Sequence, residues 1–383
     1  LNGHEACVRA LLAAGASIEA KGVKGWTPLH FSCGWGKVAC VRALLDAGAN
    51  TEADTEAMLT PLCLASKNGH LDCVELMVDA GAHLDFVYFI MVMKASPLFY
   101  ACTNGHVACA LVLLRAGALL EPKGLGFERP LYAACQNGHA ACVAALLEAG
   151  AKLEAVDTEN CFTSLHIACK AGHDACVRVL LDAGADLEAV SRFTRQTPLH
   201  LACSEGRTAC VETLLRAGAN TNAAEEGGHT PLHRACLAGH EECVRMLVDA
   251  GAGTDAVNIH HLASLHRACA KGHEACVRVL LKAGANVEAK TKEGFSALHI
   301  MCYLGIEACV RALLEAGAIV DEASLQVAKM NGHTECMLAL KEAADSRLSS
   351  AASASVRDSE AAAVSSSPVQ HNTVSNLLPN IPP

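Results

Sequence analysis

The chain is built from a repeat of about 33 residues, and this periodicity constrains its fold more than any other feature. Thr27-Pro28-Leu29-His30 returns as Thr197-Pro198-Leu199-His200 and as Thr230-Pro231-Leu232-His233. Weaker copies begin at Thr60, Ser96, Arg129, Thr163, Ala263, Ser296 and Ala323, so ten copies follow one another at steps of 27 to 36 residues. A unit of this size cannot bury an apolar face alone, whereas stacked units share a continuous core. The repeat therefore predicts a solenoid.

Each copy predicts two short helices and a connecting loop. A Thr can cap the first helix, and the following Pro suits its first turn because that position needs no N–H donor. A Gly-His pair or a relative of it ends this helix. The second helix carries an apolar face, as in Cys176, Val177, Leu180 and Leu181. It ends in Ala-Gly-Ala, where Gly184 is placed for a left-handed cap.

The Thr-Pro-Leu-His start, the Gly-His turn, the paired leucines and the Gly-Ala end resemble the ankyrin repeat over residues 1 to about 345. The resemblance implies an all-α solenoid of about ten repeats, in which antiparallel helix pairs carry β-turn fingers at right angles. It also implies a curved stack that binds partner proteins through its concave helix face and its fingers. We expect three parts: a partial repeat in residues 1–22 with only the second helix, a repeat domain in 23–345, and a tail in 346–383.

The tail is rich in Ser and Ala with scattered Pro, a composition that predicts disorder. The last helix, near Cys336 to Leu340, runs into polar residues, as a solenoid's terminal cap requires. The chain starts in the middle of the repeat pattern and without Met, which suggests a fragment of a longer protein.

Charge and hydropathy exclude several classes of partner. The net charge is −10 and no long run of Lys and Arg occurs, which argues against nucleic acid and anionic membranes. No apolar run reaches the length of about 18 residues that a membrane span needs. The 21 cysteines recur inside apolar helical patterns, as buried thiols do. We expect free thiols, a monomer, and a reducing compartment, most simply the cytoplasm, with the nucleus as an alternative.

The pattern His-x-x-Cys occurs fourteen times and raises the question of zinc. Zinc needs four donors at about 2.0–2.3 Å from one ion, whereas helices packed about 8–10 Å apart offer two donors per layer. The second-helix His is replaced by Lys37, Arg207 and Ile306 in three copies that otherwise keep the pattern. We expect no metal and no other cofactor. The resemblance implies that these histidines make structural hydrogen bonds and that the cysteines are small core residues.

Catalysis finds little support. Cys and His recur at fixed repeat positions, whereas a catalytic group should be a singular departure, and no phosphate-binding Gly-x-x-x-x-Gly-Lys motif occurs. We expect no enzymatic activity and no small-molecule substrate. One departure is the apolar run Phe86–Met93, in the finger of the 36-residue copy. It is interpreted as a finger that enters a partner, as a poorly specified strand packed on its neighbours, or as an artefact of the sequence.

Partner selectivity should lie in the fingers and inner helices, where the copies differ. Aromatic and Arg side chains are the usual energetic anchors of interfaces. The candidates are Trp26, Trp35, Tyr100, Phe162, Phe193, Arg195, His229, Arg234, Arg267, Phe295 and Tyr303. Alternatively, several of these side chains only fill gaps between fingers.

The leading hypothesis is a protein–protein interaction scaffold whose partner the sequence does not identify. The alternative is the recognition arm of a larger protein, such as a ubiquitin-ligase adaptor, a kinase or a channel, whose active domain is missing from this chain.

Overall fold

The computed structural model describes residues 3–85, 95–121, 129–157 and 161–358, and it divides into two compact units. The first unit, Leu1–Asn220, contains α1 Glu5–Ala13, the 3-10 helix η1 Val23–Gly25, α2 Pro28–Gly34, α3 Val38–Asp46, α4 Pro61–Asn68, α5 Leu71–Asp79, α6 Pro97–Thr103, α7 Val107–Arg115, α8 Pro130–Asn137, α9 Ala140–Glu148, α10 Ser164–Ala171, α11 Asp174–Asp182, α12 Pro198–Ser204 and α13 Thr208–Arg216. The second, Thr221–Pro383, contains α14 Pro231–Ala238, α15 Glu241–Asp249, α16 Ser264–Lys271, α17 Glu274–Lys282, α18 Ala297–Leu304, α19 Glu307–Glu315, α20 Glu322–Met330 and α21 Thr334–Asp358.

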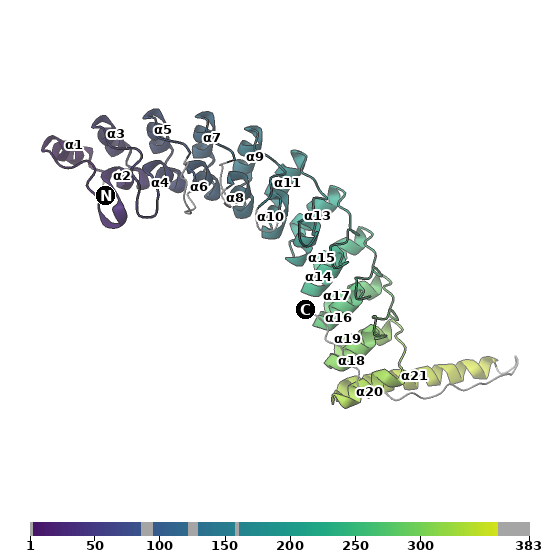
Figure 1. The fold of residues 1–383 in the computed structure, drawn as a ribbon. Coiled ribbons are helices and arrows are strands. Elements are labelled where there is room, and N and C mark those ends of the chain that lie inside the picture. Colours follow the sequence, from purple (N-terminus) through teal and green to yellow (C-terminus); the bar gives the residue numbers. More distant parts are fainter. Residues whose placement is uncertain (1–2, 86–94, 122–128, 158–160, 359–383) are drawn as a thin grey trace. The chain divides into compact units, whose positions relative to one another are not determined.

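Within each unit the helices form two layers (Figure 1). The even-numbered helices are the first helices of the repeats, and each packs on the next one of its unit, from α2 to α12 and from α14 to α20. The odd-numbered second helices pack in the same way, from α1 to α13 and from α15 to α21. Each pair, such as α2 with α3 or α14 with α15, is also in contact. The stack thus buries an apolar face that no single pair could cover.

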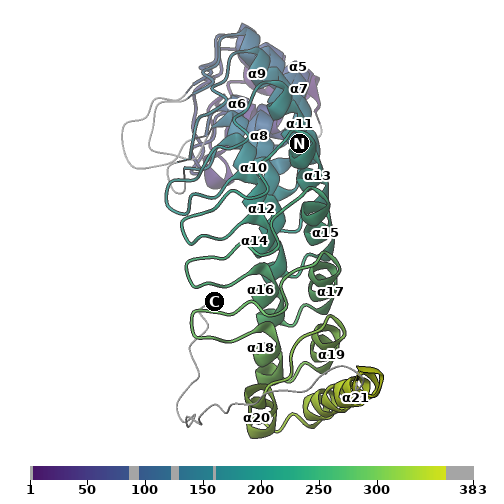
Figure 2. The same cartoon turned by 90° about the vertical axis from the view of Figure 1, so that its right-hand side faces the viewer.

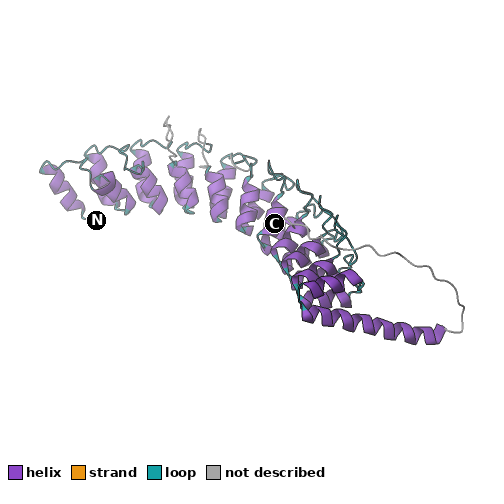
Figure 3. Ribbon diagram, turned by 60° about the horizontal axis from the view of Figure 1, so that its bottom comes forward, coloured by secondary structure: helices purple, strands orange, loops and turns teal. Residues whose placement is uncertain are grey.

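A finger, meaning the loop from a second helix to the next first helix, links successive repeats. In Figure 2 the fingers between α14 and α18 extend to one side of the helices. Isolated antiparallel bridges close three of them, Val156 with Thr163, Val257 with Ala263 and Lys290 with Ser296. The part of the chain that the structure describes has no strand beyond such bridges, and Figure 3 shows helices and loops alone. The predicted all-α solenoid with β-turn fingers is confirmed.

The first helices begin as their sequence predicts. Thr163 precedes α10 and its Oγ1 accepts the His166 backbone N–H at 3.4 Å. The His166 ring returns the contact, because its Nδ1 accepts the Thr163 backbone N–H at 3.2 Å. Two N–H groups at the helix end, which lack partners inside the helix, are thereby satisfied.

The core consists mainly of leucines, valines, alanines and cysteines. In α11, Cys176, Val177 and Leu180 are fully buried, and Gly184 has the left-handed φ of 87° expected of the cap. Cys7 is exposed and Cys161 half-buried, whereas the other nineteen cysteines are buried free thiols. The prediction that the cysteines act as small core residues is confirmed for these nineteen.

The predictions for the two ends of the repeat array and for the apolar run have different outcomes. A single helix, α1, lies in residues 3–22, and the run Phe86–Met93 falls outside the described residues. The helix α21 continues to Asp358, past the expected boundary at residue 345. Alanine, the best helix former, recurs at Ala351, Ala352 and Ala354, which explains why the helix extends into the predicted tail. The three domain limits remain predictions. No helix among the described residues is both long and apolar enough to cross a membrane.

Candidate partner-binding surface

The first-helix histidines join neighbouring repeats. In addition to its contacts with Thr163, His166 donates from Nε2 to the backbone oxygen of Gln196 in the next finger, at 2.9 Å. His30 and His233 repeat the arrangement with the backbone oxygens of Leu59 and Leu262, at 3.0 and 2.9 Å. Burial lowers the pKa of His166, which fits a neutral ring that accepts on Nδ1 and donates from Nε2. Both ring nitrogens are therefore engaged, Nδ1 in the cap of its own helix and Nε2 in holding the next finger.

The second-helix histidines join each repeat to the one before it. His106 donates from Nε2 to the backbone oxygen of Lys67 at 3.1 Å, and its ring lies over Gly69. His70, His139, His173, His273 and His333 make the same type of bond to a preceding first helix. Where Arg replaces His, Arg207 Nε donates to the Lys170 oxygen at 3.2 Å, in place of the imidazole. A side chain that only needs to supply one N–H can thus be exchanged without loss of the repeat.

These bonds account for the repeated His-x-x-Cys pattern without a metal. The ring nitrogens of histidines such as His106 and His166 bind backbone atoms, and Nε2 of His299 lies 3.1 Å from the Asp321 carboxylate. The cysteines of the pattern, apart from Cys7, lie in the core. Over the described residues, no group of three or more His, Cys, Asp or Glu side chains is placed to hold an ion.

Acidic side chains tie the fingers to one another. Glu188 Oε1 accepts the Asn220 backbone N–H at 2.8 Å, and Glu154 Oε1 accepts that of Asp186 at 2.9 Å. In the second unit, Asp255 and Glu288 bind the backbone N–H of Asn286 and Ile319, each at 2.8 Å. These carboxylates hold the base of each finger, so the tips are free to vary.

Four of the predicted partner-binding residues are exposed, namely Trp35, Phe193, Arg195 and Tyr303. Phe193 is 60% exposed at a finger tip, beside Arg192, whose guanidinium carbon lies 5.7 Å from the ring centroid. The backbone of Arg195 has a left-handed φ of 53° and its N–H donates to the Ser191 oxygen at 3.0 Å. The backbone therefore presents these two side chains from a tight turn.

Five further candidates are half-buried, namely Trp26, Tyr100, His229, Arg234 and Phe295. The aromatic ones contact neighbouring side chains: the ring centroids of Trp26 and Phe31 lie 5.0 Å apart, and those of Phe295 and His299 lie 6.0 Å apart. Lys67 Nζ lies 5.7 Å from the Tyr100 centroid. Each of these side chains keeps part of its surface for solvent or a partner.

The last two candidates, Phe162 and Arg267, are buried. Phe162 stacks on His166 at 5.4 Å and packs with Ile167 and Leu201. This burial agrees with the alternative interpretation, in which Phe162 fills a gap between fingers. Arg267 instead lies with His229 and Arg234, so the structure brings together three of the predicted residues.

Exposed apolar residues on the fingers were missed by sequence reasoning. Val156 and Val190 occupy the same finger position in the first unit, and Val257 occupies it in the second. Ile259, two residues beyond Val257, is 63% exposed. The sequence signal is an apolar residue directly after Glu-Ala or Asp-Ala, at the position where another copy has Lys290. Valine and isoleucine are not among the usual anchor residues of interfaces, so the anchor criterion does not select them.

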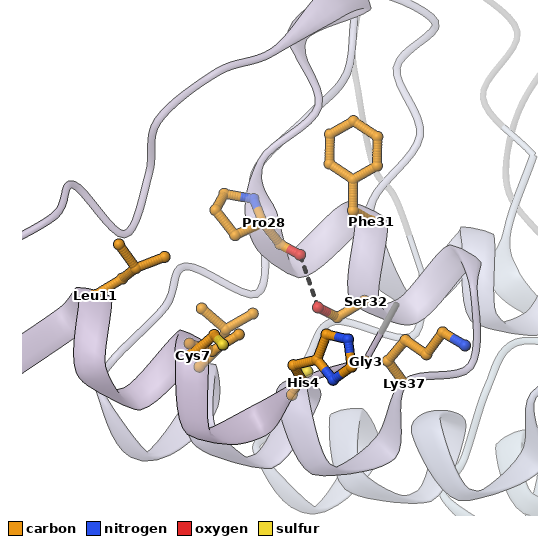
Figure 4. Close-up of a pocket in the computed structure, with 11 residues that line it drawn as sticks. Gly3, His4, Cys7, Leu11, Pro28, Phe31, Ser32 and Lys37 are labelled. Carbon is orange, nitrogen blue, oxygen red and sulfur yellow. Dashed lines mark hydrogen bonds between the residues drawn. The ribbon is translucent and has the colours of Figure 1, made fainter. Parts of the chain in front are cut away.

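A pocket of about 380 Å³ lies beside α1 (Figure 4). Cys7 and Leu11 line it from α1, facing Pro28 and Phe31 of α2, and Ser32 Oγ donates to the Pro28 oxygen at 2.9 Å. No residue of α1 is buried. Among the described residues, α1 is the one second helix without a first helix of its own repeat against it, which explains the open apolar face.

Comparisons with known proteins agree with this architecture. A family model described as ankyrin repeats (3 copies) matches residues 1–55, 49–123, 118–191, 187–259 and 251–324. The crystal structure of the human ASB11 ankyrin repeat domain is 28% identical, with a TM-score of 0.54, over 60% of this chain and 99% of that one. The ankyrin repeat domain of Bcl-3, described as a unique member of the IkappaB protein family, is 28% identical over 54% of this chain and 93% of that one, with a TM-score of 0.49. No curated protein matches the sequence.

Proposed function

Because the chain belongs to the ankyrin-repeat family, we propose that it is a scaffold that binds partner proteins through its fingers and the adjoining face of its first helices. Ankyrin repeats are in general protein–protein interaction modules. The proposal adds where on this chain the partner binds and which side chains anchor it. It assigns the chain no catalytic step of its own.

The observation that carries the proposal is the set of exposed apolar side chains on the fingers. Phe193, Val190 and Val156 in the first unit, and Ile259 and Val257 in the second, are exposed although the fold does not need them there. Scattered apolar residues are normal on a surface, but Val156, Val190 and Val257 occupy the same position of three different fingers. Buried leucines and backbone hydrogen bonds already stabilise the stack. Association with a partner would remove this apolar surface from water.

A second candidate is that the chain is the recognition arm of a larger protein, for example a ubiquitin-ligase adaptor, a kinase or a channel. The observation that favours it is the match to 99% of a chain described as the ankyrin repeat domain of human ASB11. In this case the fingers would bind a substrate or regulator, and the activity would lie in another domain.

Photo-crosslinking from single positions tests the proposed surface. A benzophenone side chain would replace Phe193 in one protein and Arg178 in a second. Arg178 lies on the second helix α11, with its side chain 62% exposed. We expect Phe193 to crosslink defined proteins in a cell extract, which mass spectrometry identifies, and Arg178 to give none of them. Crosslinks from Arg178 alone would contradict the proposal.

A further inference from the structure

A charged cluster in the second unit replaces an apolar cluster of the first. In the first unit, Phe162 precedes the capping Thr163, Ile167 is the fourth residue of α10, and Leu201 is the fourth residue of α12. These three side chains are buried together. The corresponding residues of the second unit are His229 before Thr230, Arg234 in α14 and Arg267 in α16.

The members of this cluster contact one another. Arg234 donates from Nε to Glu225 Oε2 at 3.1 Å and from Nη2 to Glu225 Oε1, which makes a two-point ion pair. Arg267 Nη2 lies 3.1 Å from His229 Nε2, and Asn258 Nδ2 lies 3.3 Å from the same nitrogen. Arg267 Nη2 and Asn258 Nδ2 are both N–H donors, so His229 Nε2 must accept. Burial, with the nearby Arg267 as a second cause, lowers the pKa of His229 to about 3, so the ring is neutral at physiological pH.

The cluster has one more positive charge than negative. Arg234 and Arg267 are cations, Glu225 is the single carboxylate among the five residues, and Arg234 already holds it at two points. Arg267 is 4% exposed, and its Nε has no hydrogen-bond partner among the described residues. Burial, and then the charge of Arg234, lower the pKa of Arg267, and the charge of Glu225 offsets this only in part.

Stability alone does not explain such a residue. A buried charge without full pairing opposes folding, and an apolar residue of similar volume is often neutral or stabilising at such a site. The chain itself uses Leu201 at the corresponding position of α12. The unpartnered Nε of Arg267 therefore points to a negatively charged group that is supplied from outside.

We propose that Arg267 and Arg234 form a recognition site for a carboxylate, the side chain of an Asp or Glu in an extended segment of the partner protein. Arginine matches a carboxylate because its planar fork can donate two parallel hydrogen bonds. The side chain of Arg234 is 26% exposed and gives access to the cluster. A single surplus positive charge balances one carboxylate, whereas a phosphorylated residue brings a charge of about −2. This inference rests on the proposed function and names the chemistry of part of that partner.

A positional-scanning library of short peptides, with blocked termini, tests the site. Its members fix Asp, Glu, Asn, Gln or phosphoserine at each position in turn, and the purified full chain is the receptor. We expect the chain to prefer Asp or Glu over the matching amide at one position by about tenfold, roughly the strength of one charge-assisted hydrogen bond. Arg267→Leu should remove this preference and leave the melting temperature unchanged or higher. Arg278→Leu, which removes an arginine from the exposed face of α17, should keep the preference.

A second variant gives an effect of opposite sign, which misfolding cannot imitate. Glu225→Gln removes the internal carboxylate that competes for the arginines, so it should bind the acidic peptides severalfold more tightly. This variant decides the question if Arg267→Leu fails to fold. Free N-acetyl-aspartate amide should not displace the peptides at the concentrations at which they bind. Displacement by it would indicate a small carboxylate ligand and contradict a protein partner.

The remaining outcomes separate this inference from the proposed function. Peptides that bind without any acid preference, or with the preference intact in Arg267→Leu, overturn the carboxylate site and leave the scaffold standing. A preference for phosphoserine over Asp and Glu, or weaker acid binding by Glu225→Gln, also overturns it. If no library member binds while the crosslinker at Phe193 captures a partner, the carboxylate site is wrong and the scaffold is supported.

Discussion

At the scale of the residue, glycine and histidine work as a pair. Gly69 has a left-handed φ of 75°, and a Cβ added there would lie 2.5 Å from His106 Nδ1. The missing side chain therefore serves two purposes, since it permits the turn and leaves room for the ring of the next repeat. Gly81 has almost the same φ of 76° but nothing within 4 Å of the added Cβ. Backbone strain would therefore affect a side chain at either glycine, whereas a clash with a histidine ring would occur only at Gly69.

Replacing each of these glycines by Ala tests that separation. Gly81→Ala should lower the free energy of unfolding by about 1 kcal/mol, because an L-residue is strained in the left-handed region. Gly69→Ala should lose the same amount and about 0.5–1.5 kcal/mol more, since the displaced His106 gives up its bond to Lys67. Urea unfolding followed by circular dichroism measures both. Equal losses in the two variants would show that the ring contact contributes nothing.

The buried histidines predict how stability depends on pH. Burial lowers the pKa of His30, His166 and His266 below the value of about 6.5 of the unfolded chain. As the pH falls through about 6.5, the unfolded state takes up protons first, so stability is full above this pH and is lost below it. The melting temperature should therefore drop between pH 7 and pH 5. In His166→Cys, which copies Cys63 at the same helix position, the drop should be smaller. An identical drop would contradict the assignment.

The cysteines make a prediction about reactivity. The thiolate is the reactive form, and burial raises the pKa of Cys73, Cys109 and Cys176 to about 11. In the native protein we expect only the exposed Cys7 and the half-buried Cys161 to react promptly with a maleimide at neutral pH. All 21 should react after denaturation. Rapid native labelling of many cysteines, located by peptide mapping, would contradict the packed core.

At the scale of the element, each repeat separates a core face from a variable finger. Leu180 lies fully buried in α11, while Phe193, thirteen residues further on, lies exposed on the following finger. The finger is held at its base by Glu188 and its neighbours, so its tip is not required for packing. Core and finger should therefore respond differently to the same kind of substitution.

Truncation to Ala at these two positions tests the division. Leu180→Ala should cost about 2–5 kcal/mol of stability, because it leaves a cavity between packed helices. Phe193→Ala should change stability by no more than about 0.5 kcal/mol, as at other surface sites. The midpoints of urea unfolding give both values. A large loss in Phe193→Ala would mean that the finger tip packs on the fold.

At the scale of the whole molecule, the sequence was most informative where the repeat recurs. The capping Thr163, the Gly184 turn and the buried leucines follow from local chemistry that ten copies present again and again. The end of α21 was harder to predict, because the repeat stops beyond Leu340 and only helix propensity then indicates where the helix ends. The burial of Phe162 and Arg267 could not be predicted, since it depends on how a finger lies over the next helix.

The histidine network also predicts the response of the whole molecule to metal removal. Because the ring nitrogens of residues such as His106 and His166 bind backbone groups, no folding energy should come from an ion. A chelator should leave the helical circular-dichroism signal and the melting temperature unchanged. Stoichiometric zinc in the purified protein, together with unfolding on chelation, would contradict this.

The affinity of alanine variants for a partner recovered by crosslinking tests the central claim most directly. Isothermal titration calorimetry would compare Phe193→Ala and Ile259→Ala with Arg178→Ala, whose side chain is exposed on a second helix. If the fingers bind the partner, at least one finger variant should lose about tenfold or more in affinity, or 1.4 kcal/mol, while its melting temperature is unchanged. Arg178→Ala should bind normally. Normal binding by both finger variants, with a loss in Arg178→Ala, would show that the recognition surface lies elsewhere.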